Sequence, residues 1–319
     1  MRTSNIYLAV RLFVGILTLV IVLYILLGNI EKIIESINRI TILGIIVLII
    51  LNLLYLPGRA KRWQIFKPNE KYKTLLLATN ISLAIGYFTP GKAGEVIRDE
   101  ILIGKRDNIE KKTSYIYERV CDVTVLCFYS ILFLILAFFS NELFLPPEFL
   151  TDFSLVIYSG IILALIVFIV TFLANRYFKK NLNLKPGDFN PNDTKSIILC
   201  LTWTFIIQIP FLLQLFVLSL VFDIPYFIFA SLSLVSQLFG VFSGLPAGLG
   251  AQEYSWTYLL TGLLELEAFI ALTIVFTVRI IETIVILLSG SLSSFIMKIS
   301  TVKEVANNIT DFSEKNVSQ

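Results

Sequence analysis

Residues 81–102 read ISLAIGYFTPGKAGEVIRDEIL, and this stretch differs from the mostly apolar sequence around it. The apolar run that leads into it, residues 74–88, is shorter than the ~20 residues that a helix needs to cross a bilayer. The run ends in a turn at Pro90, and charged residues follow at Glu95 and Arg98. A segment that only anchored the chain in lipid would have no use for this turn, so we expect it to carry function.

The composition is typical of a membrane protein. Of the 319 residues, 56% are hydrophobic and 15% are charged, whereas soluble domains carry roughly a quarter charged residues. Long apolar runs without alternating polarity predict membrane-spanning helices and not a barrel. The chain has no histidine, and its three cysteines lie in apolar runs without C-x-x-C spacing. We therefore expect no metal site and no cofactor.

The distribution of Lys and Arg predicts how the apolar stretches thread the membrane, because these residues collect on the cytoplasmic side. Lys and Arg are dense in residues 59–73 and 92–119. These two basic segments would lie on opposite sides of the membrane if all eight apolar stretches of the chain crossed it. Residues 74–103 are therefore predicted to enter from the cytoplasm and return to it, and 227–264 to do the same from the acidic outer side. The other six stretches are predicted as full spans: Leu8–Leu27, Ile40–Leu56, Val120–Phe139, Leu155–Ala174, Ile197–Phe222 and Ala268–Met297.

The predicted fold class is an all-α polytopic membrane protein with six full transmembrane helices and two opposed re-entrant helical hairpins. Residues 1–300 would form a single transmembrane domain and 301–319 a cytoplasmic polar tail. We expect the chain in the plasma membrane with both termini in the cytoplasm.

The two halves of the domain, about 40–139 and 197–297, carry matching residues in the same order. Each predicted hairpin contains Pro, then Gly, then Glu, and each following span contains Arg with an acid three residues later. The first set is Pro90, Gly94, Glu95, Arg119 and Asp122, and the second is Pro246, Gly250, Glu253, Arg279 and Glu282. This order predicts an inverted repeat, the construction of many transporters with a site at the membrane midplane.

The turn that begins at Pro90 predicts an anion-binding helix start. Proline lacks an N–H and suits the first turn of a helix, and the free N–H groups there favour phosphate or carboxylate. Lys92 adds a cation beside Gly91, and Glu95 and Arg98 share one helix face. The alternative is a cytoplasmic loop followed by an ordinary capped helix.

The second turn contains three glycines and a proline within residues 244–250. It predicts a helix broken inside the membrane, where irregular backbone is tolerated only beside protein or a water-filled cavity. Glu253 would lie in the first turn of the new helix. An external loop with a capped helix is the alternative.

Charged residues in the spans are the third signal. Arg279 and Glu282 are predicted near mid-bilayer, where a charge costs roughly 2.5–3.5 kcal/mol and such residues usually face a cavity. A local structural ion pair is the alternative. Arg119 and Asp122, with Glu118 beside them, lie nearer a membrane surface and could snorkel to it. Gln208 and Gln214 fit either a cavity lining or helix packing.

At these motifs the sequence resembles a known family. TPGKAGEVIRDEIL is similar to the T-P-G-x-x-G-E-x-x-R motif of the flippase-like integral membrane proteins, which include the transmembrane region of lysylphosphatidylglycerol synthetase. ERVCD at 118–122 resembles the family's E-R-x-x-D, and GLPAGLGAQE resembles its P-x-G-x-G-x-x-E segment. Arg279 matches the arginine of the late helix.

The resemblance implies a protein that moves an anionic, modified or polyprenyl-phosphate-linked lipid between leaflets. Together with the residue-based reasoning, it gives one candidate lipid-headgroup site: Pro90, Gly91, Lys92, Gly94, Glu95, Arg98, Glu118, Arg119, Asp122, Pro246, Gly248, Gly250, Glu253, Arg279 and Glu282. The soluble aminoacyltransferase and glycosyltransferase domains of family members have no counterpart in this sequence, so the resemblance does not extend to lysyl transfer.

Two other functions are kept as alternatives. The first is a lipid-modifying enzyme within the membrane that uses Glu95 or Glu253 as a base, although no catalytic metal or nucleotide motif favours it. The second is a membrane partner or scaffold of a separately encoded lipid-modifying transferase. A second copy of the chain is a further candidate partner, and nucleic acid is not expected as one.

Overall fold

The computed structural model describes residues 35, 37–87, 95, 98, 101, 108–140, 194–243, 245, 248 and 250–317. The predicted spans Leu8–Leu27 and Leu155–Ala174 lie outside these residues, as do five residues of the predicted site: Pro90, Gly91, Lys92, Gly94 and Pro246. The described part is entirely helical, with the elements α3 (Ile42–Gln64), α4 (Tyr72–Tyr87), α6 (Asn108–Phe139), α8 (Thr194–Phe222), α9 (Tyr226–Ser243), α10 (Ala251–Leu263) and α11 (Ala268–Val317).

Five of these helices contain segments that are long and apolar enough to cross a membrane: Ile42–Gln64, Tyr117–Phe139, Ser196–Phe222, Tyr226–Ser243 and Ala268–Met297. This confirms the prediction of a polytopic α-helical membrane protein. The four described full spans of the prediction fall in α3, α6, α8 and α11. Helix α9, expected to be half of a hairpin, has 18 residues and so a length of about 27 Å.

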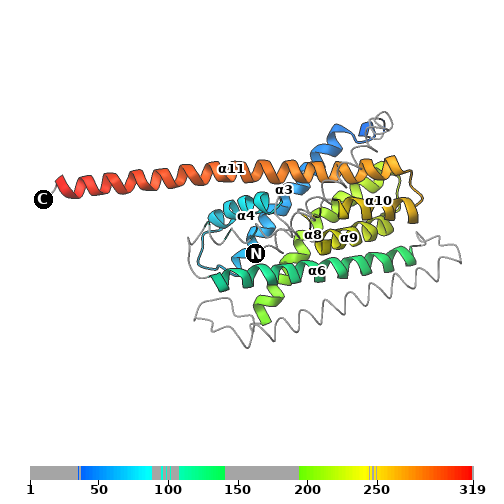
Figure 1. Ribbon diagram of the computed structural model, residues 1–319, viewed down its shortest axis with the longest axis horizontal. Helices are drawn as coiled ribbons and strands as arrows, with labels where there is room; N and C mark the ends of the chain where they lie inside the picture. Colours follow the sequence, from blue (N-terminus) through cyan, green and yellow to red (C-terminus); the bar gives the residue numbers. More distant parts are fainter. Residues whose placement is uncertain are drawn as a thin grey trace, which may run out of the picture.

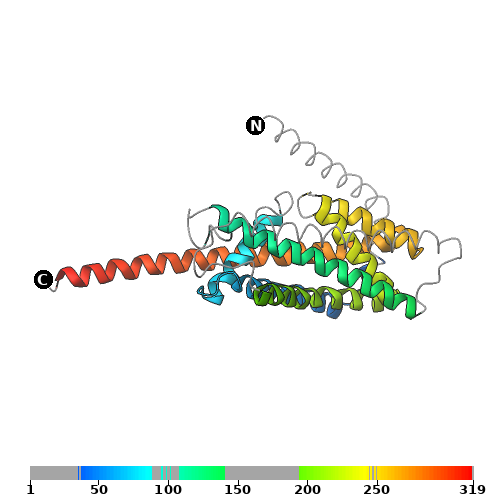
Figure 2. The same cartoon turned by 90° about the horizontal axis from the view of Figure 1, so that it is seen from below.

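The described helices lie side by side in a bundle (Figures 1 and 2), with α6 packed on α9, α3 on α8 and α4 on α11. Fully buried Leu215, Phe229, Trp256 and Ile274 lie in its centre. Many Ile and Leu side chains point outward, among them Leu220 at 68% exposure, as expected for helices that face lipid tails. Helix α11 continues through the polar tail as far as Val317, and this end projects beyond the other described helices (Figure 1).

The turn between α9 and α10 folds tightly against α9. Gly248 and Gly250 have φ angles of 70° and 85°, a region that glycine adopts without strain. A Cβ at Gly248 would also lie 2.9 Å from the Cα of Gly240. The carboxylate of Glu253 accepts a hydrogen bond from Gly250 N at 2.7 Å. The predicted break is therefore a capped glycine turn, and α10 begins directly after it.

Helices α4 and α11 approach closely because small residues face each other. A Cβ at Gly290 would lie 3.0 Å from the carbonyl oxygen of Asn80 and would also collide with the Cβ of Ala84. Nearby, Asn80 Nδ2 donates a hydrogen bond to Ser293 Oγ at 3.0 Å. A glycine at this point therefore sets the distance between the two helices.

We predict that Gly290→Val destabilises the protein by about 1–3 kcal/mol, because the added side chain overpacks the contact between α4 and α11. Thermal unfolding of the detergent-solubilised protein measures this. Gly262→Ala is the matched control, since nothing beyond the neighbouring backbone of its own helix lies within 4 Å of a Cβ at Gly262. Equal melting temperatures for the two variants would contradict the tight packing.

Candidate functional site

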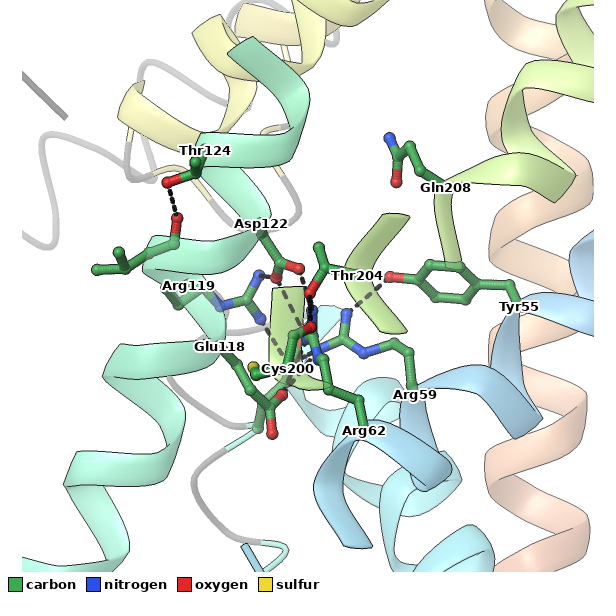
Figure 3. Close-up of polar contacts among 12 residues, drawn as sticks. Tyr55, Arg59, Arg62, Glu118, Arg119, Asp122, Thr124, Cys200, Thr204 and Gln208 are labelled. Atoms are coloured by element: carbon green, nitrogen blue, oxygen red, sulfur yellow. Dashed lines mark hydrogen bonds and ion pairs between the residues drawn. The ribbon is translucent and has the colours of Figure 1, made fainter. Parts of the chain in front are cut away.

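Seven charged side chains from three parts of the chain form a buried group that we call the first charged cluster. Helix α3 provides Arg59 and Arg62, and helix α6 provides Glu118, Arg119 and Asp122, while Glu95 and Arg98 come from the segment between α4 and α6. Among the residues that the structure describes, four arginines and three carboxylates meet here, which gives these seven side chains a net charge of +1. Figure 3 shows the guanidinium groups of Arg59, Arg62 and Arg119 directed toward the acids of α6.

Glu118 accepts hydrogen bonds from two arginines of different segments, and Arg59 Nη2 lies 3.9 Å from its Oε2. Arg98 binds both of its oxygens, through Nη2 to Oε1 at 2.6 Å and through Nη1 to Oε2 at 3.0 Å. Arg62 Nη2 donates to Oε2 at 3.0 Å. Arg98 also stacks over Trp63, with its guanidinium 4.7 Å from the ring centroid. All five side chains are essentially buried, so Glu118 holds the segments together from inside the protein.

Glu95 and Asp122 complete the cluster. Glu95 Oε2 lies 2.6 Å from Arg59 Nη2 and 2.5 Å from Arg119 Nη2. Asp122 pairs with Arg62 and lies 3.5 Å from Arg119 Nη1. Arg119 and Asp122 keep 19% and 20% of their side chains exposed, while Glu95 is 1% exposed. Arg119 is therefore the arginine of this cluster that reaches an open space.

Helical spacing explains why these side chains meet. Arg59 and Arg62 are three residues apart and share a face of α3, and Glu118 and Asp122 are four apart and share a face of α6. Tyr55, one turn before Arg59, accepts a hydrogen bond from Arg59 Nη1 at 2.7 Å. Breaking such a buried pair is costly because the remaining charge is left without a partner.

A second charged cluster surrounds Arg279 on α11. Arg279 Nε binds Glu253 Oε1 of α10 at 2.5 Å, and Arg279 Nη1 binds Glu282 Oε2 at 3.0 Å. The guanidinium also lies 5.8 Å from the centroid of the Tyr87 ring. The local Arg279–Glu282 pair, which was the alternative to a cavity-facing role, is thus present, and Glu253 extends it to the glycine turn.

The two clusters share one arrangement. In the first, Glu95 pairs with Arg119, which pairs with Asp122 three residues later. In the second, Glu253 pairs with Arg279, which pairs with Glu282 three residues later. These six residues are the charged ones among the ten that match between the two halves of the sequence. The correspondence therefore extends from residue order to contacts.

A cavity of about 130 Å³ lies between the two clusters. Arg119 lines it from the first cluster, and Arg279 and Glu282 line it from the second. Five amide side chains from four helices line it as well: Asn52, Gln208, Gln214, Gln237 and Gln252. Gln208 Nε2 donates to Gln237 Oε1 at 3.2 Å. This cavity has room and polar partners for a small charged group.

The cavity divides the predicted site residues into two groups. One group lines the cavity: Gly248, Arg119, Arg279 and Glu282. Beside it, the hydrogen bond from Gly250 N to the carboxylate of Glu253 holds the adjoining turn. Glu95, Arg98, Glu118 and Asp122 lie behind Arg119 in the first charged cluster. Gln208 and Gln214, which fitted either a cavity or packing, both line the cavity.

Arg59 and Arg62 are site residues that the sequence did not predict. Both were expected in a basic cytoplasmic loop, but they lie in the last turns of α3 with 2% and 0% exposure. Their three-residue spacing at the end of an apolar helix was the available signal. Asn52 and Gln237 were not predicted at the site either.

These features define a class of protein: a polytopic α-helical membrane protein with paired buried charges around a polar cavity. The family model described as the lysylphosphatidylglycerol synthase TM region matches residues 8–290. The chain belongs to this family, as the resemblance in the sequence indicated. A search of curated proteins finds no match.

We predict that Glu118→Gln destabilises the protein by as much as about 3–5 kcal/mol, because two buried arginines lose their shared carboxylate. The melting temperature of the purified protein measures the effect. Glu267→Gln is the control, since Glu267 is exposed on the loop before α11. A variant at Glu118 that melts like the control would show that the cluster adds little stability.

Proposed function

We propose that this protein moves a lipid with an anionic headgroup between the leaflets of the plasma membrane, and that the headgroup binds in the cavity between Arg119 and Arg279. The observation that carries this proposal is the cavity itself, lined by one arginine from each of two equivalent clusters. Arginine suits a phosphate because its planar N–H groups match phosphate oxygens.

Charge supports an anionic ligand at the Arg119 side. The seven described side chains of the first charged cluster include one more arginine than carboxylates, and an unbalanced charge in a membrane-spanning region is costly. A bound phosphate would neutralise it. The side chain of Arg119 is the one in this cluster that both lines the cavity and keeps 19% exposure.

The amide side chains suit the rest of a headgroup. Each Asn or Gln offers both a donor and an acceptor, so the five amides lining the cavity can replace water around phosphate oxygens and hydroxyl groups. Such replacement lowers the cost of moving a polar headgroup through the hydrocarbon. The cost of moving the headgroup through the hydrocarbon is the main barrier that a lipid transporter has to reduce.

The two halves would provide the alternating access. We infer six full spans and two opposed re-entrant hairpins, related as an inverted repeat with both termini in the cytoplasm. The equivalent contacts of Glu95 with Arg119 and of Glu253 with Arg279 support the repeat. In such transporters one repeat rocks against the other around a central site.

The family favours one alternative function. A chain that belongs to the family of the lysylphosphatidylglycerol synthase TM region could serve as the membrane partner of a separate lipid-modifying transferase. The same cavity would then present the lipid to that enzyme. Co-purification with a transferase, and lipid modification that persists without leaflet exchange, would favour this role over transport.

Reconstituted liposomes test the transport proposal. Fluorescent phosphatidic acid, phosphatidylglycerol and a polyprenyl phosphate serve as probes, and quenching of the outer leaflet measures exchange. We predict that Arg119→Gln and Arg279→Gln each slow exchange at least tenfold, because the phosphate loses its charged partner.

Two further variants separate binding from folding. Gln214→Leu changes the cavity lining without touching an ion pair of either charged cluster, and we expect it to slow exchange several-fold. Lys61→Gln is the control, since Lys61 is an exposed cation on α3, and it should behave like the wild type. Wild-type exchange rates in both arginine variants, or no exchange by the wild type with any probe, would overturn the proposal.

A further inference from the structure

An apolar groove lies on the outer surface of the bundle along α3 and α11. It has a volume of about 580 Å³, and none of the described residues that line it is charged. Helix α3 contributes Ile49 and Leu53, and α11 contributes a row that runs from Thr277 to Leu292. Ile284 and Leu288 in this row are 50% and 66% exposed.

The groove and the polar cavity lie against the same two helices. On α3, Asn52 lines the cavity and its neighbour Leu53 lines the groove. On α11, Glu282 lines the cavity and Ile281 lines the groove, and Val285 lines both. The contact between α3 and α11 therefore separates the polar cavity from the apolar groove, and the side chain of Val285 borders both.

This arrangement matches an amphiphile in both chemistry and length. The row from Thr277 to Leu292 spans 15 helical steps, about 22 Å at 1.5 Å per residue. One leaflet of the hydrocarbon core is roughly 15 Å thick, half of the whole core. The groove is thus long enough for an extended hydrocarbon chain from one leaflet.

We propose that the groove binds a hydrocarbon chain of the transported lipid while its headgroup occupies the cavity, and that the headgroup enters between α3 and α11. This inference rests on the proposed function and adds to it a chain-binding site and an entry route. The occupant is a fatty acyl or isoprenoid chain, because the lining is aliphatic apart from Thr277 and Ser289. The lipid is then recognised by its tail as well as by its charge.

Photocrosslinking of the full chain in vesicles tests the inference. A benzophenone amino acid is placed at Ile284 in the groove or, as a control, at Leu220, a lipid-facing residue of α8 outside the groove. The vesicles contain a tenth dioleoyl phosphatidic acid in phosphatidylcholine. We expect phosphatidic acid adducts at 284 to exceed those at 220 several-fold, and Arg119→Gln to abolish this excess.

Binding measurements provide an independent check. Native mass spectrometry should show that Ile284→Trp, which fills the groove, lowers retention of dioleoyl phosphatidic acid at least fivefold but leaves dihexanoyl phosphatidic acid unaffected. Leu220→Trp should change neither.

The outcomes distinguish this inference from the proposed function. Equal lipid adducts at 284 and 220, or adducts at 284 with the first apolar stretch or a second copy of the chain, would overturn the groove assignment. Slow exchange in Arg119→Gln together with unchanged retention in Ile284→Trp would overturn it too, while leaving transport intact. Unchanged exchange in both Arg119→Gln and Arg279→Gln would instead remove the function on which it rests.

Discussion

The interaction on which the rest of this structure depends is the pairing of buried arginines with carboxylates from other parts of the chain. An unpaired charge is expensive in a membrane-spanning region, so each guanidinium restricts where its partners can lie. Glu118 fixes α6 against α3 through Arg62, and Glu253 fixes α10 against α11 through Arg279. These ion pairs therefore restrict how α6 lies against α3 and how α10 lies against α11.

The same constraint positions the cavity. Arg119 and Arg279 each use part of their guanidinium on acids of their own cluster, and both still line the space between the clusters. Held in this way, the two arginines are already placed for a ligand and need little rearrangement to bind it. Under the proposed function such shared charges would favour release of the lipid, because the acids compete with the ligand for the arginines.

The features that could be predicted from the sequence are those that depend on residues close together in the chain. The glycine turn before Glu253 and the i,i+3 pair of Arg279 follow from backbone freedom and helical spacing, and both are present. Arg62 could not be assigned because its burial depends on Glu118, 56 residues away, and a basic residue after an apolar helix is normally a cytoplasmic flank. The meeting of Asn52 and Gln237 at one cavity likewise depends on how α3 and α9 are placed within the bundle.

The central claim is that a lipid headgroup occupies the space between Arg119 and Arg279. A structure of the protein in nanodiscs that contain an anionic phospholipid, determined at a resolution that reveals bound lipid, tests this most directly. The account predicts phosphate density within hydrogen-bond distance of at least one of the two guanidinium groups. Density for water alone in the cavity, with every ordered headgroup on the outer surface of the bundle, would contradict it.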